Sequence, residues 1–148
     1  TYISVPKQII NAGYKVFFEN TEWKGIYQLE PFNIWDSAGR FTKDMYVGNN
    51  SLQVLSFQIK KRLPIGRGGI ILTDDKGAYE YLKKIRYDGR DLNKSQLEDD
   101  IDLFGYHMYM TPEDAARGLI LFNQLNTKHE DTHSSESYKD ITKNSIFS

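Results

Sequence analysis

The feature that most constrains the fold is the alternation of short apolar runs with segments that carry helix signals. The apolar runs that have the length of buried strands are 15–19, 32–35, 51–57 and 69–73. The segments with helix-start and helix-stop residues are 4–13, 74–87 and 111–124. Strands that alternate with helices predict an α/β fold with a mostly parallel sheet.

The third of these helices carries apolar residues on all sides, so we expect it to be mostly buried. From Thr127 onward the chain is polar, which predicts a tail or a lone surface helix over residues 127–148. His129, Glu130, Asp131 and His133 lie in this stretch and could ligate a metal. In such a polar context the interpretation as a solvated surface is favoured, and no metal site is expected.

Length and composition bound the possible functions. The 148 residues favour one domain and can bury a core. The lack of cysteine excludes disulfides, thiolate zinc sites and cysteine nucleophiles. A net charge of −1 gives no reason to expect nucleic acid or an anionic membrane as partner. No apolar stretch approaches the roughly 18 residues of a membrane span, and no signal peptide is visible, so a cytoplasmic setting is the default. Because the first residue is Thr1 rather than Met, the chain is either processed or lacks upstream residues.

The most informative segment is 56–69 (SFQIKKRLPIGRGG), which places lysines on a glycine-rich loop between two expected strands. Ligands of α/β sheets bind near strand ends, and a lysine desolvated there becomes a nucleophilic amine. On spacing alone, a solvated basic loop of Lys60, Lys61 and Arg62 is the favoured interpretation. The glycines are not a nucleotide-binding loop, because no Lys-Ser/Thr pair follows them.

This segment resembles the pattern Ser-Phe-(His/Asn)-x-x-Lys-x-Leu-x-x-Gly-x-Gly-Gly of the DegT/StrS aminotransferases. The resemblance implies that Lys61, five residues before Gly66, forms the Schiff base with pyridoxal 5'-phosphate (PLP). It also implies that Ser56 hydrogen-bonds the cofactor phosphate. Gln58 and Arg67 depart from the residues common in the family, but the lysine is retained.

A second match is Asp36-Ser37-Ala38, which resembles the family's Asp-(Ala/Ser)-Ala after a strand. The resemblance implies that Asp36 pairs with the pyridine nitrogen and keeps it protonated, which makes the ring an electron sink. It also implies that Ala38 lets the ring lie flat against the backbone. Without the resemblance, Asp36 would be interpreted as a turn or helix cap. Gly39 replaces the usual Gln or His, and no role is carried over to it.

Two further stretches are similar to the family. Tyr2 stands where an aromatic residue stacks on the pyridine ring, although a tyrosine partly buried at a chain end would look the same. Residues 105–111 resemble Gly-x-Asn-x-Arg-Met. There the resemblance implies that His107, at the position of the Asn, reaches the cofactor phosphate of the other subunit of a homodimer. Tyr109 departs from the pattern, because it stands where the family has the arginine. The alternative for His107 is a lone histidine packed in a loop.

The resemblance covers roughly residues 1–125. It implies a partial aspartate-aminotransferase-like large domain, with residues 1–126 as the PLP-binding segment. The implied activity is transamination of a nucleotide-linked keto sugar with glutamate as amino donor. Residues 18–36 are fewer than the family has there, and both the upstream Gly-Thr segment and the small domain are missing. These gaps leave two alternatives, an inactive or regulatory protein with the PLP fold and a gene fragment without activity of its own.

Overall fold

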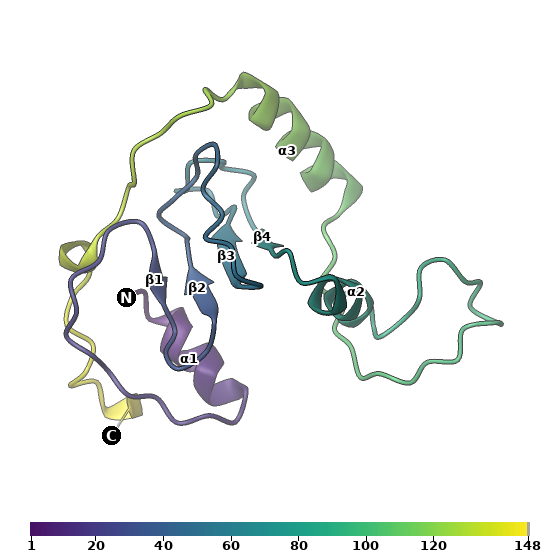
Figure 1. Cartoon of the computed structure of the whole chain (residues 1–148), viewed down its shortest axis with the longest axis horizontal. Helices are drawn as coiled ribbons and strands as arrows, with labels where there is room; N and C mark the ends of the chain where they lie inside the picture. The colour runs from purple at the N-terminus through teal and green to yellow at the C-terminus, as the bar shows by residue number, and fades with distance from the viewer. Residues whose placement is uncertain (148) are drawn as a thin grey trace.

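The centre of the fold is a four-stranded sheet in the order β1-β2-β3-β4, seen in a computed structural model that describes residues 1–147 (Figure 1). The strands are Tyr27–Gln28 (β1), Ile34–Asp36 (β2), Leu52–Ser56 (β3) and Gly69–Leu72 (β4). β2 and β3 are parallel, whereas β1–β2 and β3–β4 are antiparallel. The α/β class is confirmed, but among the four strands described only the pair β2–β3 is parallel. The chain returns after β3 through a loop without a crossover helix, and such a return gives antiparallel neighbours.

The helices are Ser4–Asn11 (α1), Lys76–Ile85 (α2) and Pro112–Gln124 (α3), followed by the 3₁₀ turns Ser135–Ser137 and Ser145–Phe147. Asp75, not Asp74, caps α2, because its side chain accepts a hydrogen bond from the Ala78 amide. Asp74 instead accepts a hydrogen bond from the Tyr46 hydroxyl. Thr111 caps α3 as expected.

Two expectations from the sequence are wrong. Residues 15–19 form no strand, because no neighbouring segment pairs with them, and Phe17 is 89% exposed. Helix α3 is not mostly buried either: within it only Gly118 is buried, and Leu119 is 66% exposed. Its apolar residues therefore cover little of the sheet.

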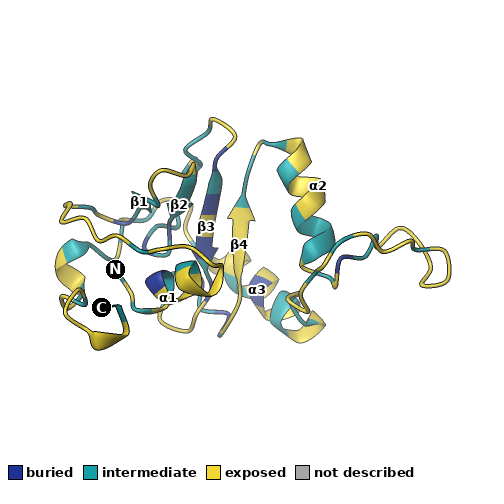
Figure 2. Cartoon of the chain, turned by 90° about the horizontal axis from the view of Figure 1, so that it is seen from below, coloured by how far each residue is buried: buried dark blue, intermediate teal, exposed yellow. Residues whose placement is uncertain are grey.

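The core is small and lies between the chain that follows β3 and helix α3. Its buried apolar residues are Leu55, Phe57, Leu63 and Ile65. Strand β4 is largely exposed, in contrast to β3 (Figure 2). The chain exposes 11059 Å², whereas a compact monomer of 17.2 kDa exposes about 7,800 Å². Substantial apolar surface is therefore left uncovered.

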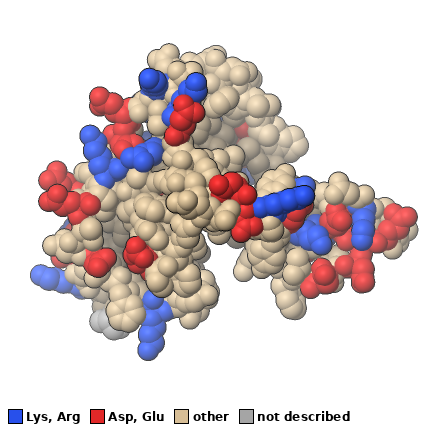
Figure 3. Space-filling view, in the orientation of Figure 1, with Lys and Arg blue, Asp and Glu red and all other residues tan. Residues whose placement is uncertain are grey.

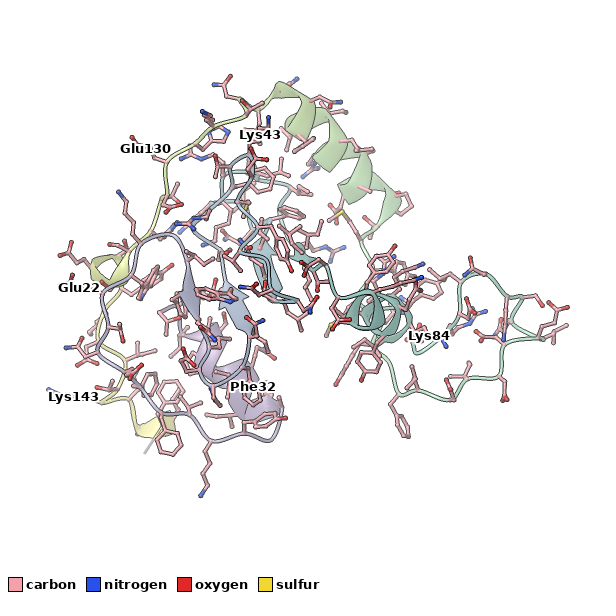
Figure 4. The ribbon with its side chains drawn as sticks, in the orientation of Figure 1. Glu22, Phe32, Lys43, Lys84, Glu130 and Lys143 are labelled. Atoms are coloured by element: carbon pink, nitrogen blue, oxygen red, sulfur yellow. The ribbon has the colours of Figure 1, made fainter. Side chains whose placement is uncertain are left out.

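Residues 127–138, which we call the strap, run back from α3 along the sheet toward β1 (Figure 1). The strap is bound by backbone hydrogen bonds from the Lys43 amide to Thr127, from Thr132 to Gly39 and from the Gly25 amide to His133. In Figure 4, Lys43 lies where the strap begins, and Glu130 lies further along it. Within the stretch 127–148 expected as a polar tail or surface helix, residues 128–134 are non-helical chain held against the loops of the sheet, and the two 3₁₀ turns follow.

The surface carries charges of both signs, which lie mostly around the rim of the face shown and on the projection beyond α2 (Figure 3). No helix within residues 1–147 is both long and apolar enough to cross a membrane.

Candidate functional site

The loop that follows β3, residues 57–68, closes on itself and presents Lys61; we call it the lysine loop. The Phe57 amide donates to the Gly68 carbonyl and the Gly66 amide donates to the Phe57 carbonyl, each at 2.9 Å. Leu63 in the same loop is buried in the core. Gly68 has a φ of +83°, which a residue with a side chain rarely adopts. The core and these hydrogen bonds therefore fix the position of Lys61.

Lys61 is partly buried, whereas the adjacent Lys60 is exposed. Burial lowers the pKa of the Lys61 amine, and the carboxylate of Asp36 offsets part of that shift. The influence of Asp36 shows that the two side chains lie within electrostatic reach of each other. More of the Lys61 amine is unprotonated at neutral pH than for a fully solvated lysine, as nucleophilic lysines require.

Asp36 is the last residue of β2, and each of its carboxylate oxygens accepts one hydrogen bond. The Ala38 amide donates to Oδ1 at 2.8 Å, and the Tyr27 hydroxyl donates to Oδ2 at 2.6 Å. Tyr27 faces Asp36 directly in the β1–β2 register. Burial, reinforced by the charge of Asp36, raises the pKa of Tyr27 far above its ordinary value, so its hydroxyl remains a donor.

Ser56, the last residue of β3, lies at the same edge of the sheet as Asp36. Because β2 and β3 are parallel, their carboxyl ends meet at this edge, where ligands of α/β sheets commonly bind. The Ser56 hydroxyl accepts a hydrogen bond from the Gln58 amide at 3.3 Å, and its proton remains available to donate. Asp36, Ser56 and Lys61 thus belong to one edge.

Aromatic side chains line this region, and several of them were not predicted. Tyr2, which was predicted, is 60% exposed, and its ring lies 6.5 Å from that of Tyr138. Tyr138 also contacts Trp23 at 5.8 Å and stacks on His133 at 6.0 Å. Burial first, and the charge of Asp36 second, raise the pKa of Tyr138. A cavity of about 920 Å³ opens here, with Trp23, Tyr27 and Tyr138 in its wall.

His133 comes from the strap, in the stretch that the sequence favoured as solvated surface. The Thr132 hydroxyl lies 3.1 Å from the Gly39 carbonyl and 2.7 Å from Nδ1 of His133. Since a carbonyl only accepts, both hydrogen bonds form when the hydroxyl donates to Gly39 and accepts from Nδ1–H. This assignment leaves Nε2 with a free lone pair. Burial, and secondly the charge of Lys61, lower the pKa of His133, so the imidazole is neutral at pH 7.

Gly39 makes room for His133. A β-carbon at position 39 would lie 3.2 Å from the His133 β-carbon and 3.1 Å from the Gly25 α-carbon. The departure of Gly39 from the family pattern was the one sequence signal for this close approach. Within residues 1–147, no group of three or more His, Cys, Asp or Glu side chains is arranged to hold a metal.

The structure holds His107 apart from this group of residues. Its Nδ1 lies 3.1 Å from the Asp88 carboxylate, and its ring contacts Tyr109 edge-on at 4.5 Å. His107 pairs with Tyr87 just beyond α2, where the chain projects away from the sheet (Figure 1). The structure therefore brings together Tyr2, Asp36, Ala38, Ser56 and Lys61 at one edge, but not His107.

The fold is thus an α/β domain with an amine and a carboxylate at the carboxyl edge of a parallel strand pair. A comparison with protein families matches residues 36–140 to the DegT/DnrJ/EryC1/StrS aminotransferase family, and the chain belongs to that family. The resemblance inferred from the sequence is confirmed, and the match fits a partial aminotransferase domain. It begins at Asp36 and includes Lys61, His107 and the whole strap, whereas Tyr2 lies outside it. Searches of curated proteins and of solved structures gave no match.

Proposed function

We propose that this chain carries the lysine-bearing site of a PLP-dependent aminotransferase. The observation that carries the proposal is that the partly buried Lys61 lies in the loop after β3, at the same carboxyl edge of the parallel β2–β3 pair as Asp36. A lysine that is partly desolvated keeps more of its amine unprotonated, which suits it to attack a carbonyl carbon.

The donor set of the site fits PLP. Each oxygen of Asp36 accepts one hydrogen bond and retains a second lone pair for the ring nitrogen. Lys61 offers an amine for the aldehyde, and the Ser56 hydroxyl offers a donor for the phosphate. Tyr2 and Tyr138 offer aromatic faces beside them.

When bound, PLP supplies an electron-withdrawing ring that makes the adjacent carbon of the amino substrate acidic. Lys61 would first bind the aldehyde carbon. Once released as a free amine, it would take a proton from that substrate carbon. Asp36 would keep the proton on the ring nitrogen. The strap lies against the lysine loop, since the Arg62 guanidinium donates to the Glu130 carbonyl at 3.2 Å.

The test is borohydride reduction of the PLP-loaded chain followed by peptide mapping. Covalent label is expected on Lys61 in the parent chain and in Lys60→Ala, and it should be lost in Lys61→Ala. The exposed Lys60 is the matched control, since it is the neighbouring lysine of the same loop. Label on Lys60, or PLP that is not retained by the parent chain, contradicts the proposal.

The substrates we propose are a nucleotide-linked keto sugar as acceptor and glutamate as amino donor, as the family membership suggests. The cavity of about 920 Å³ has Tyr27, the hydrogen-bond partner of Asp36, in its wall and gives space for such an acceptor. The absorbance of bound PLP in single-turnover experiments tests each half-reaction separately. Glutamate alone tests the transfer of the amino group to the cofactor, and subsequent addition of a keto sugar nucleotide tests its transfer to the acceptor.

We propose further that the working unit is a homodimer. His107 is exposed on a projecting segment, and the chain exposes far more surface than a compact monomer of its mass. In a dimer, His107 would reach the phosphate bound by the partner subunit. Molar mass and PLP retention across a dilution series should fall together, and His107→Ala should weaken PLP binding by about 1–2 kcal/mol.

A further inference from the structure

We propose that Tyr27 is a positioning residue for Asp36, which holds the carboxylate in place and leaves a lone pair of each oxygen directed to the cofactor. This inference rests on the proposed function and deepens it, because it assigns a role in the site to a residue outside every motif of the family.

The first argument is the register of the sheet. Tyr27 and Asp36 are direct partners across the antiparallel β1–β2 pair, so their side chains leave the sheet on the same face. The Tyr27 hydroxyl donates to Oδ2 at 2.6 Å. The ring of Trp23 lies 4.7 Å from the Tyr27 ring and restricts its rotation.

The second argument is the direction of each hydrogen bond. A carboxylate only accepts, so the phenol proton of Tyr27 is committed to Asp36. The hydroxyl of Thr1, which contacts the same phenol oxygen, must then donate to it. A chain of donors therefore runs from Thr1 through Tyr27 to Asp36 and ends on the negative charge.

The third argument is that this donor persists. Burial, followed by the charge of Asp36, raises the pKa of Tyr27, so the phenol stays protonated at every pH at which the site would work. A hydrogen bond to the charged form of a carboxyl group favours that form. With the Ala38 amide on Oδ1, each oxygen is fixed by one donor, and the carboxylate cannot rotate without breaking both bonds.

Tyr27→Phe removes the hydroxyl and keeps the ring packed on Trp23, so the fold should be retained. The matched control is Tyr46→Phe, because Tyr46 also donates from its hydroxyl to a carboxylate, that of Asp74, beyond β4. Tyr46→Phe also removes the acceptor of the Asp74 amide, so both variants lose hydrogen bonds between a tyrosine and an aspartate, but only Tyr27→Phe loses one at the site.

The first experiment measures the pH dependence of the absorbance of bound PLP, with kcat and KM for glutamate. In Tyr27→Phe the absorbance titration should shift, and kcat should fall about tenfold with KM nearly unchanged, because Asp36 is no longer held. Tyr46→Phe should match the parent chain in every respect.

A second experiment needs no cofactor. In the chain with ¹³Cζ-labelled tyrosine, the Tyr27 signal is assigned by its loss in Tyr27→Phe, and Asp36→Asn should change its chemical shift at pH 7, since the charged acceptor of its hydrogen bond is gone. A Tyr27 signal that Asp36→Asn leaves unchanged overturns the inference, as does a Tyr27→Phe variant that behaves like Tyr46→Phe. Tighter PLP binding by Tyr27→Phe would overturn it too, because the hydroxyl would then occupy the place of the ring nitrogen. A parent chain that binds no PLP would instead refute the proposed function itself, and this inference with it.

Discussion

Asp131 anchors the strap to the loop that follows β2, and removing its carboxylate should destabilise the whole fold. Arg40 binds it with both ends of the guanidinium, from Nε to Oδ1 at 3.0 Å and from Nη2 to Oδ2 at 2.8 Å. The side chains of Arg40 and Asp131 are 28% and 17% exposed. The carboxylate also lies against Gly25, where an added β-carbon would come within 2.1 Å of the Asp131 Cγ. The hydrogen bond to Asp131 raises the pKa of Arg40, which indicates a close pair.

The magnitude follows from this geometry. Exposed ion pairs contribute about 0–1 kcal/mol, whereas two charge-assisted hydrogen bonds in a mostly buried pair contribute more. Asp131→Ala leaves a partly buried guanidinium without its partner, so we expect the free energy of unfolding to fall by about 2 kcal/mol. For a chain of this size, the same change lowers Tm by about 4–8 °C.

Urea unfolding followed by tryptophan fluorescence measures the effect, since the backbone carbonyl of Trp23 accepts from the strap at Ser135. The matched control is Asp114→Ala, which breaks the Arg67–Asp114 pair at 3.2 Å, where the Arg67 side chain is 77% exposed. The control should lose less than about 1 kcal/mol. Equal losses in the two variants would refute the reasoning, because burial and bidentate geometry would then contribute nothing.

Two other changes test the packing and the charges around the strap. Gly118→Ala places a β-carbon 2.7 Å from Cδ1 of Ile65. Overpacking should outweigh the higher helix propensity of alanine, so the free energy of unfolding should fall by about 1 kcal/mol. A stabilised variant would show that Ile65 moves aside without cost. Because the pKa of His133 is lowered in the folded chain, the stability it contributes is present above its ordinary pKa of 6.5 and is lost as the pH falls through the lowered value. In His133→Asn the loss of stability between about pH 7 and 5 should therefore be smaller than in the parent chain, and identical slopes in urea unfolding would contradict that.

The elements that carry the site could be predicted from the sequence, because their signals are local. The apolar runs 32–35 and 51–57 predicted β2 and β3 to within two residues of their observed bounds, and the glycines after Lys61 predicted the lysine loop. Residues 15–19 have the same apolar character, yet they form no strand. A run of apolar residues does not indicate whether a partner strand lies beside it in the fold. In the short connection before β2, Tyr27 had no motif to single it out.

The strap could not be predicted, because it has no periodicity and, apart from Tyr138, no apolar residue that would indicate burial. It is held by backbone hydrogen bonds to residues far away in the chain, such as Gly25 to His133 and Thr132 to Gly39. Such bonds depend on the position of the main chain and leave little trace in residue type. The one residue type that reflects this contact is Gly39, whose lack of a side chain is explained by the close approach of His133 in the structure.

The groups that the strap brings to the site are neutral, and this has an electrostatic consequence. Tyr138 remains protonated because its pKa is raised, and His133 remains uncharged at pH 7 because its pKa is lowered. Asp131 of the strap is paired with Arg40, and the strap's other charged residues, Lys128, Glu130 and Glu136, are exposed. The strap therefore adds rings beside Asp36 and Lys61 without adding a competing charge. Because the attraction between opposite charges grows as the surroundings become less polar, covering the site in this way strengthens the mutual influence of the carboxylate and the amine. A charged residue in place of His133 would compete directly for one of them.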